Sequence, residues 1–283
     1  TSTASDTNVL GEGSGVALYS LDYDASDAGG NYDGAPTDVT FGVDGQINYG
    51  TGFNGSSSYI TADKSMFGTG DGVANLWSIS LWFKTDGSVT ASRTLVGTKG
   101  NSAQSGFFLY MISGGQIRYY EGNTSTNSQQ LTTTASYDDG NWHNVVMTRS
   151  GTTDVFTMYI DGAEVIAPTT MTNPHTSHNF NLHIGRYPAS ALYFWDGTID
   201  QVRVFRKALS STEVSTLYGE TACVYTPTTD NNDYPVTNTA YYKLDNNAED
   251  AKGNYDGAES NITYGFGRFG QAAVFNGSSS YIT

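Results

Sequence analysis

Apolar and polar residues alternate along short stretches of this chain, which is the pattern of β-strands with one buried face. The clearest stretch is residues 77–84, WSISLWFK, where every second residue from Trp77 to Phe83 is apolar. Trp82 falls on the opposite, polar face, so we expect this strand to be covered on both sides. Further strands are predicted at 94–98, 106–112, 116–120, 142–149, 155–160, 181–185 and 198–205.

Turn and helix signals fall between these strands. Gly114-Gly115 and Asp161-Gly162 are suited to two-residue hairpin turns, because these residues tolerate a positive φ. Residues 210–213, SSTE, form a capping-box pattern and predict one short helix that ends at Gly219. Short strands with turns every ~8–12 residues predict an all-β fold, a two-sheet antiparallel sandwich with that single helix near its end.

The opening of the pattern returns near the end of the chain. Residues 30–35 are copied at 253–258, and residues 53–61 are copied at 275–283. Such a long period indicates tandem domains rather than a solenoid. We therefore predict the following organisation: an arm or linker at 1–15, a domain at 16–218, a linker at 219–238, and the first strands of a second, incomplete copy at 239–283.

Three strands leave most of their apolar face uncovered, so the second copy is not expected to be stable alone. Two explanations are open. Either the protein continues beyond residue 283, which we favour, or residues 239–283 supply strands to a neighbouring molecule.

Composition narrows the class of protein. The 33 Gly and 20 Tyr, with only 14% charged residues, are typical of an all-β extracellular protein. The net charge of −15 argues against binding nucleic acid or anionic lipid and suits hard cations or a solvated acidic surface. Cys223 is the only cysteine, which excludes an intrachain disulfide. No apolar run approaches the ~20 residues of a membrane span, so membrane insertion is not expected.

Several local patterns, in this order and spacing, resemble one known family. They are LD at 21–22 followed by DAGGNYDG at 27–34, FNGSSSY at 53–59, WSISLW at 77–82, NWHNV at 141–145 with MYIDG at 158–162, and GTIDQVRV at 197–204 followed by KALS at 207–210. Together they resemble the laminin-G-like jelly-roll branch of the concanavalin A-like lectin/glucanase superfamily. The resemblance implies a jelly-roll sandwich that works as a binding or adhesion module, often with calcium, and in a minority of members cleaves glycans. The tandem repeat and the composition rich in Ser, Thr, Asn and Gly also resemble those of fibre or virion surface proteins of marine bacteriophages.

Strand parity and one loop suggest a calcium site. Asp200 shares a strand face with Val202 and Val204, and a carboxylate facing a core is costly unless it is paired, hydrogen-bonded or metal-bound. The loop Asp27–Asn31–Asp33 offers hard oxygens of the kind Ca²⁺ takes, and the family resemblance places this loop beside the Asp200 strand. We therefore predict Ca²⁺ bound by Asp27, Asn31, Asp33 and Asp200. The alternative is that Asp200 caps backbone N–H groups and that the loop is an Asx-type turn.

Aromatic residues suggest where a ligand binds. The connection 186–195 holds Tyr187, Tyr193 and Trp195, whose flat rings with polar edges can stack on sugars. These three are the predicted ligand-binding residues, and Tyr119 and Tyr120 are weaker candidates. The alternative is that the connection covers the sandwich edge or packs against a neighbouring subunit.

A catalytic site is not expected. The Glu-x-Asp-x-x-Glu strand of the family's glucanases is missing, and no two glutamates fall on one strand. The predicted function is a non-catalytic, extracellular or virion-surface adhesion module that binds a glycan or cell-surface receptor. One alternative is a purely structural virion or filament subunit whose partners are copies of itself or other virion proteins. A glycan hydrolase is the other.

Overall fold

The computed structural model describes residues 10, 15–68, 76–99, 105–122, 128–151, 153–172, 177–220, 240, 242–250, 253–266 and 271–283. The chain divides into two compact units, Thr1–Ala222 and Cys223–Thr283. The predicted arm at 1–15 and linker at 219–238 lie almost wholly outside the described residues, as does Cys223. The two units are considered separately below.

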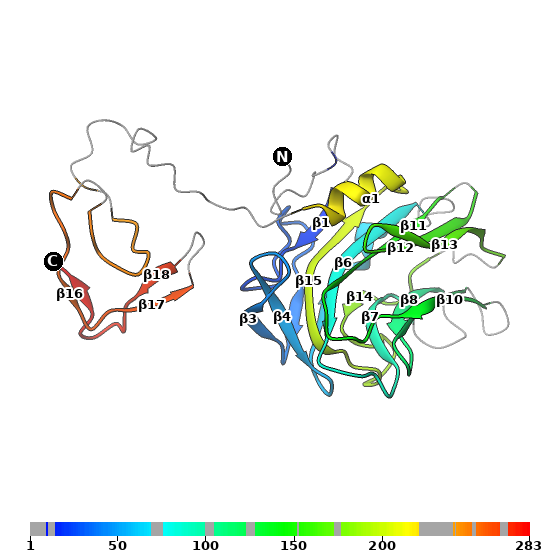
Figure 1. The fold of residues 1–283 in the computed structure, drawn as a ribbon, viewed down its shortest axis with the longest axis horizontal. Coiled ribbons are helices and arrows are strands. Elements are labelled where there is room, and N and C mark those ends of the chain that lie inside the picture. Colours follow the sequence, from blue (N-terminus) through cyan, green and yellow to red (C-terminus); the bar gives the residue numbers. More distant parts are fainter. Residues whose placement is uncertain are drawn as a thin grey trace. The chain divides into compact units, whose positions relative to one another are not determined.

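The first unit is the predicted sandwich of two antiparallel sheets (Figure 1). One sheet has the order β13-β12-β11-β6-β15-β4-β3, with β1 also pairing with β15. Its strands are β13 (Ala163–Thr170), β12 (Val155–Ile160), β11 (His143–Arg149), β6 (Trp77–Thr85), β15 (Asp196–Phe205), β4 (Tyr49–Asn54), β3 (Thr40–Asp44) and β1 (Gly15–Tyr19). The all-β, two-sheet prediction is confirmed.

The second sheet has the order β10-β9-β8-β7-β14-β5-β2. Its strands are β10 (Ser128–Ser136), β9 (Gln116–Gly122), β8 (Gly106–Met111), β7 (Arg93–Gly97), β14 (Leu182–Ile184), β5 (Tyr59–Ala62) and β2 (Ala35–Thr37). A short 3-10 helix, η1 (Lys64–Phe67), follows β5. The entering strand β1 and the leaving strand β15 lie side by side, with Tyr19 opposite Val202.

The predicted helix forms as α1 (Ser211–Tyr218). The side chain of Ser210 accepts from the Glu213 N–H, and the Glu213 side chain returns to the Ser210 backbone, which completes the capping box. Val214 and Leu217 pack on the outer face of the first sheet with Val146 and Phe205. The ring of Tyr218 stacks on Trp82 at 5.5 Å, so β6 is covered on both faces as expected.

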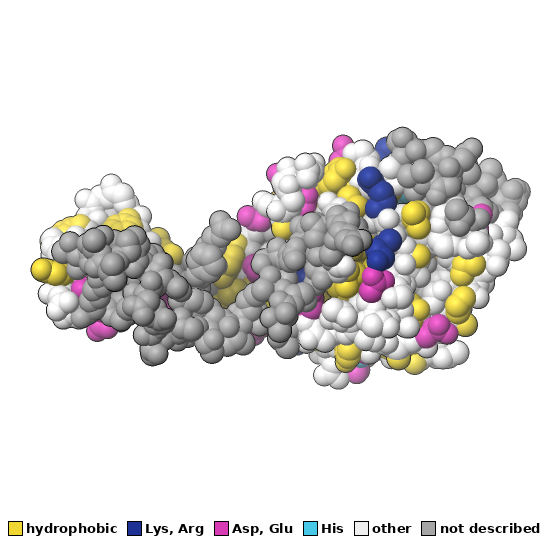
Figure 2. All heavy atoms as spheres, turned by 90° about the horizontal axis from the view of Figure 1, so that it is seen from above, with side chains coloured by type: hydrophobic (Ala, Val, Ile, Leu, Met, Phe, Trp, Pro, Cys, Tyr) yellow, Lys and Arg dark blue, Asp and Glu magenta, His cyan; other side chains and the backbone are white. Residues whose placement is uncertain are grey.

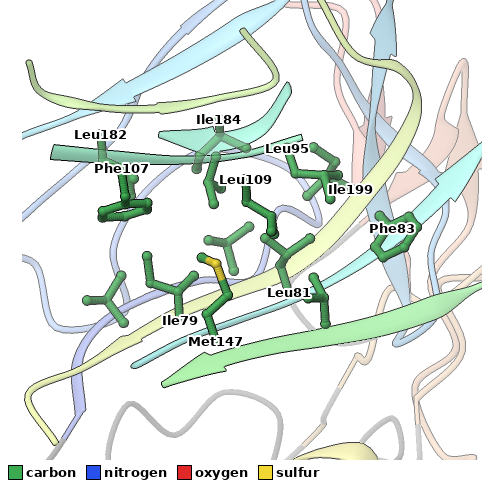
Figure 3. Close-up of a cluster of buried hydrophobic side chains, with 14 of the residues drawn as sticks. Ile79, Leu81, Phe83, Leu95, Phe107, Leu109, Met147, Leu182, Ile184 and Ile199 are labelled. Atoms are coloured by element: carbon green, nitrogen blue, oxygen red, sulfur yellow. The ribbon is translucent and has the colours of Figure 1, made fainter. Parts of the chain in front are cut away.

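The core lies between the two sheets (Figure 3). Ile79, Leu81 and Phe83 of β6 face inward and are fully buried, as strand parity predicted. Leu109 and Ile184 approach them from the second sheet. Because this core is closed between the two sheets, sites for ligands have to be sought on the outer faces and the rims.

The surface carries the chain's acidic character. On the face shown in Figure 2, acidic side chains are scattered among uncharged ones, and the few basic side chains lie close together. No helix in the described part of the chain is long and apolar enough to cross a membrane.

The second unit repeats the opening pairings of the first. Strand β16 (Glu259–Ser260) pairs with β19 (Tyr281–Ile282), and β17 (Thr263–Phe266) pairs with β18 (Gln271–Val274). These pairs correspond to β2 with β5 and to β3 with β4. An isolated bridge between Tyr242 and Asp250 likewise repeats the one between Tyr19 and Asp27.

Candidate functional site

An aromatic hollow lies on the outer face of the second sheet. Strand β8 carries apolar side chains on both of its faces, so it contributes to two surfaces. Phe107, Leu109 and Met111 are fully buried in the core between the sheets. Phe108 and Tyr110 alternate with them along the strand and therefore lie on the outer face of the sheet. This second set of apolar positions begins the site.

The pairing of β8 with its neighbouring strands places further aromatic and polar residues beside Phe108 and Tyr110. Phe108 stands opposite Tyr120 of β9, which stands opposite Gln130 of β10. Their rings pack closely: Phe108 lies 4.4 Å from Tyr110 and 5.2 Å from Tyr120, measured between ring centroids. Three adjacent strands thus present one continuous aromatic surface that ends in an exposed amide.

The connection 186–195 closes the other side of the hollow. The Tyr187 N–H donates to the Leu192 carbonyl at 3.2 Å, and the Thr94 N–H of β7 donates to the Tyr193 carbonyl at 2.7 Å. Tyr193 has a φ of 53°, in the left-handed region that non-glycine residues rarely adopt. The ring of Tyr187 then contacts Phe108 at 5.4 Å and Tyr193 at 5.7 Å, edge to face.

The resulting hollow has a volume of about 360 Å³. Its lining residues are Phe108, Tyr110, Tyr120, Gln130, Tyr187, Leu192 and Tyr193. None of them carries a charge at neutral pH. Burial raises the pKa of the Tyr110 and Tyr187 phenols, so both remain protonated and can donate hydrogen bonds. Flat apolar rings with hydroxyl and amide groups at their edges suit a ligand that is itself apolar on its faces and polar at its rim.

Two of the three predicted ligand residues line this hollow, and the third does not. Tyr187 and Tyr193 are lining residues, and Tyr193 is 43% exposed. Trp195 is fully buried and packs edge-on against Phe83 at 5.8 Å, so its assignment as a ligand residue was wrong. The reason is local: the Trp195 N–H bonds to the Gly185 carbonyl just before β15 begins, and the side chain then falls on the core side.

The alternation of side chains along β9 places the two weaker ligand candidates, Tyr119 and Tyr120, on opposite faces of the sheet. Tyr120 lines the hollow, whereas Tyr119 is fully buried and stacks on Phe156 at 3.9 Å. Phe108, Tyr110, Gln130 and Leu192 were not predicted. The signal that could have identified two of them is the doubly apolar strand 106–111, which shows that its outward face is occupied as well.

The predicted calcium loop is an Asx-type turn. The Asp27 carboxylate accepts four backbone N–H groups: those of Leu18, Gly29, Asn31 and Tyr32, at 3.0 to 3.3 Å. Asp33 accepts from the Asp27 N–H at 3.0 Å, and the Asn31 side chain donates to the Gly29 carbonyl at 3.0 Å. The oxygens of Asp27 are therefore used in holding the turn.

Asp200 has a different environment. It is fully buried, and its Oδ2 accepts from the Gln46 and Ile47 N–H groups of the β3–β4 turn, each at 2.9 Å. Within the described part of the chain, Oδ1 has no hydrogen-bond partner. Burial raises the pKa of this carboxyl to about 8, and the nearby charge of Asp22 adds to the shift. Among the described residues, no three His, Cys, Asp or Glu side chains gather into a metal-binding group. The four predicted ligands thus have separate hydrogen-bonding roles: Asp27, Asn31 and Asp33 within the loop, and Asp200 at the β3–β4 turn.

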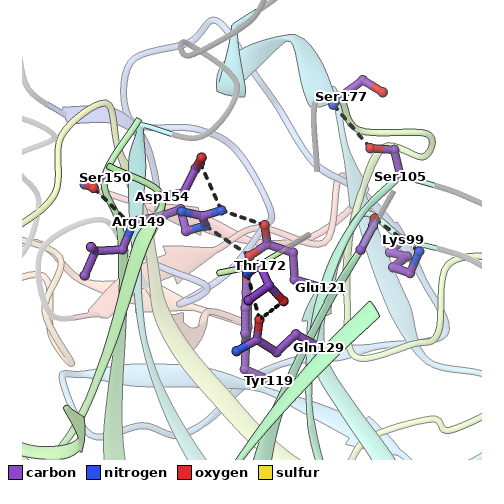
Figure 4. Close-up of polar contacts among 12 residues, drawn as sticks. Lys99, Ser105, Tyr119, Glu121, Gln129, Arg149, Ser150, Asp154, Thr172 and Ser177 are labelled. Atoms are coloured by element: carbon purple, nitrogen blue, oxygen red, sulfur yellow. Dashed lines mark hydrogen bonds and ion pairs between the residues drawn. The ribbon is translucent and has the colours of Figure 1, made fainter. Parts of the chain in front are cut away.

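A buried ionic cluster joins the two sheets at another position (Figure 4). Arg149 of β11 binds both carboxylate oxygens of Glu121 of β9, at 2.8 and 3.0 Å, and Asp154 lies 3.3 Å from the same guanidinium. The Tyr119 hydroxyl also donates to Glu121, at 2.6 Å. Glu121 and Arg149 are both fully buried, so this cluster acts as an internal link between the sheets.

Solved structures with the same fold include several binding domains. Domain 4 of AbnA, an extracellular GH43 arabinanase from Geobacillus stearothermophilus solved in complex with arabinotriose, matches with a TM-score of 0.57 and 23% identity over 72% of this chain and 97% of that domain. The binding domain of botulinum neurotoxin serotype D matches with a TM-score of 0.58 and 15% identity, over 77% of this chain. The binding domain of Paraclostridial Mosquitocidal Protein 1 matches with a TM-score of 0.55 and 17% identity, over 71% of this chain.

The chain spans about half, 52%, of each of these last two binding domains. At these identities the likeness concerns the fold. No curated protein sequence matches the chain. A sequence model of the laminin G type matches residues 54–215, more than half of the 283 residues, and the chain therefore belongs to the concanavalin A-like lectin/glucanases superfamily.

Proposed function

We propose that the first unit is a non-catalytic glycan-binding module and that the aromatic hollow on its second sheet is the binding surface. The observation that carries the proposal is the convergence of five aromatic rings and one exposed amide on a hollow with no charged lining residue. Sugar rings have apolar faces and hydroxyl rims, so they can stack on Tyr187 and Tyr193 and hydrogen-bond to Gln130 and the phenols.

The comparisons support a binding role in general terms. One structure of the same fold was solved with arabinotriose, and others are called binding or receptor-binding domains. We propose accordingly that this protein is an adhesion module on the outside of a cell or virion and that it belongs to a tandem, fibre-like series. The repeat at 239–283 and the polar, glycine-rich composition support this part of the proposal.

A glycan array of the full chain tests the proposal. We expect Tyr187→Ala and Tyr193→Ala each to weaken retention about tenfold, because each removes one stacking surface. Tyr255→Ala is the matched control, since Tyr255 is a tyrosine in the second unit with 56% exposure. If no glycan is retained, or if all three variants behave alike, the hollow is not the glycan site. Release of shorter sugars from a bound oligosaccharide would instead favour a hydrolase.

A purely structural role is the second candidate. Tyr242, Phe275 and Tyr281 of the second unit are 39%, 50% and 54% exposed. Exposed apolar residues are typical of surfaces that meet another protein when they form one continuous patch. Sedimentation analysis of the full chain distinguishes this role from the first. Assembly that Phe275→Ala abolishes, together with an empty glycan array, would favour the structural subunit.

We also propose that calcium binds at Asp200 rather than at the Asp27 loop. The loop does not fit a metal, because the Asp27 oxygens already accept four N–H groups. Asp200 fits in one respect: its Oδ1 is buried and has no hydrogen-bond partner among the residues that the structure describes, and Asp22 adds a second negative charge nearby. Calorimetric titration with CaCl₂ should show binding that Asp200→Asn abolishes and Asp27→Asn leaves intact. No heat of binding in the unsubstituted protein would overturn the proposal.

A further inference from the structure

Two arginines on the outer face of the second sheet, one of them at the edge of the hollow, have no acidic partner among the described residues. Three other arginines in the described part of the chain form ion pairs with carboxylates: Arg93 with Asp196, Arg149 with Glu121 and Arg203 with Glu220. No such pair occurs there for Arg118, Arg186 or Arg206. In a chain with 28 acidic and 13 basic residues, carboxylates are plentiful. Two of these three unpaired guanidiniums, Arg118 and Arg186, belong to the outer face of the second sheet.

Arg118 lies at the edge of the hollow. It stands directly opposite Tyr110, a lining residue, and its Cζ is 6.0 Å from the centroid of that ring. Its Nε donates to the Thr132 hydroxyl of β10 at 2.9 Å. The phenol of Tyr110 is also hydrogen-bonded to the Arg118 side chain. These contacts hold the guanidinium at the edge of the hollow, and its five N–H donors exceed these two acceptors.

Arg186 precedes Tyr187, which lines the hollow. Its Cζ lies 3.9 Å from the centroid of Tyr59 on β5, and its Nη2 is 3.3 Å from Nε2 of His183. Its Nε is buried and has no hydrogen-bond partner among the described residues. Arg186 is therefore held against Tyr59 and His183, and its buried Nε is not exposed to a ligand in the hollow.

Planar guanidiniums held in place are well suited to carboxylate and sulfate, which they can bind through two parallel hydrogen bonds. The overall negative charge of the protein repels anions at long range, so any preference for an anion has to arise at short range from such groups.

We propose that the hollow selects sugars that carry an anionic group, a carboxylate or a sulfate, and that Arg118 is the residue that determines this specificity. The inference rests on the proposed glycan-binding function and deepens it. The aromatic rings bind the faces of the sugar, while the arginine distinguishes a charged sugar from its neutral counterpart.

The test compares matched ligands on the full chain. Uronic acid oligomers, their neutral reduced counterparts and sulfated oligomers are titrated at about 50 mM and about 500 mM NaCl. We expect the anionic oligomers to bind at least about tenfold more tightly at low salt and the difference to shrink at high salt. Comparing the carboxylated and sulfated oligomers identifies which anionic group is preferred.

Three variants locate the effect. Arg118→Gln should remove about tenfold of the affinity for the anionic oligomer and leave the neutral one within about twofold. Arg118→Lys should restore part of the affinity, because it keeps the charge without the planar fork. Arg206→Gln is the control, since Arg206 is also without an acidic partner in the described part of the chain and donates to the Met66 carbonyl, at 3.2 Å. Thermal unfolding of each variant verifies that it is folded.

Each outcome supports or overturns the proposal. Equal binding of charged and neutral oligomers, with loss on Tyr193→Ala, would overturn the charge preference and retain the glycan site. An Arg118→Gln variant that behaves like Arg206→Gln would overturn the role of Arg118. Retention of no oligomer at all would overturn the proposed function together with this inference.

Discussion

Residues 53–61 and 275–283 have the same nine-residue sequence and the same local hydrogen bonds. Asn54 and Asn276 each accept from the N–H groups two, three and four residues later. Their surroundings differ. Phe53 is 3% exposed in the first unit, and its counterpart Phe275 is 50% exposed in the second.

The same contrast extends over the whole repeated opening. Tyr19 and Tyr242 donate to the carbonyls of Tyr32 and Tyr255, at 2.6 and 2.5 Å, yet the first tyrosine is fully buried and the second is 39% exposed. Strands β15, β6 and β14 cover the first copy, and the described residues of the second unit include no counterpart of them. The local sequence therefore determines the turns, while burial depends on strands far away in the chain.

Hydrogen exchange should show the largest difference. Because residues 53–61 and 275–283 are identical, their intrinsic exchange rates are closely matched and any difference in protection reflects the surrounding structure. We expect 53–61 to be protected at least ~10³-fold more strongly, since core strands open only with much of the domain. Mass spectrometry of the peptides measures this, and the urea-unfolded chain, where the two rates converge, is the control. Equal protection would mean that the second copy is covered in solution.

Phenylalanine truncation gives the next largest effect. Phe53→Ala should lower the free energy of unfolding by about 3–5 kcal/mol, because it opens a cavity where the ring packs over Gly185. Phe275→Ala should change it by less than ~0.5 kcal/mol. Urea unfolding followed by tryptophan fluorescence measures this, since all four tryptophans lie between residues 77 and 195. A large effect of Phe275→Ala on this transition would show that the repeated segment supports the first unit.

Asp200 is a further difference, because the second copy includes no equivalent of it. The pKa of this carboxyl is about 8 in the folded protein and 3.8 ordinarily. The folded state therefore binds more protons between these values, so the contribution of this carboxyl to the unfolding free energy should be complete below pH 4 and should decline as the pH rises through 8. Urea unfolding in EDTA, so that no cation favours the ionised form, measures the decline. Asp200→Asn should flatten it, and parallel curves for the two proteins would contradict this explanation.

Each strand range that the sequence predicted falls on a strand with at least one buried face. Residues 77–84 alternate so clearly that the strand, its inward face and the covering of Trp82 on its outer face were all predicted. The opening strands β1 to β5 were predicted only as a group, without ranges. Strands β10 and β13 were missed. Both lie at the edges of their sheets, and their sequences, SQQLTTTAS and AEVIAPTT, are polar or contain proline, as edge strands often do.

The site was predictable only in part, for a related reason. The aromatic content of the connection 186–195 identified Tyr187 and Tyr193. Phe108 and Tyr120 enter the hollow because β8 pairs with β9 in one particular register, and pairing between strands does not follow from the pattern of either strand alone. The buried position of Trp195 depends in the same way on where the loop joins β15.

The Asp27 turn provides the smallest and most local test of the comparison. Its carboxylate accepts four backbone N–H groups in a buried position. Asp27→Ala should therefore lower the unfolding free energy of the first unit by about 1–3 kcal/mol. Asp250 is also buried, at 3% exposure, and accepts from the Asn254 N–H at 3.2 Å. Asp250→Ala should nevertheless leave the tryptophan-monitored transition unchanged and increase hydrogen exchange only around residues 250–257. Both carboxylates hold the same turn. If the two substitutions raise hydrogen exchange equally around their own turns but only Asp27→Ala lowers the unfolding free energy, the turn forms by itself. The covering strands are then what makes its loss destabilise the whole domain.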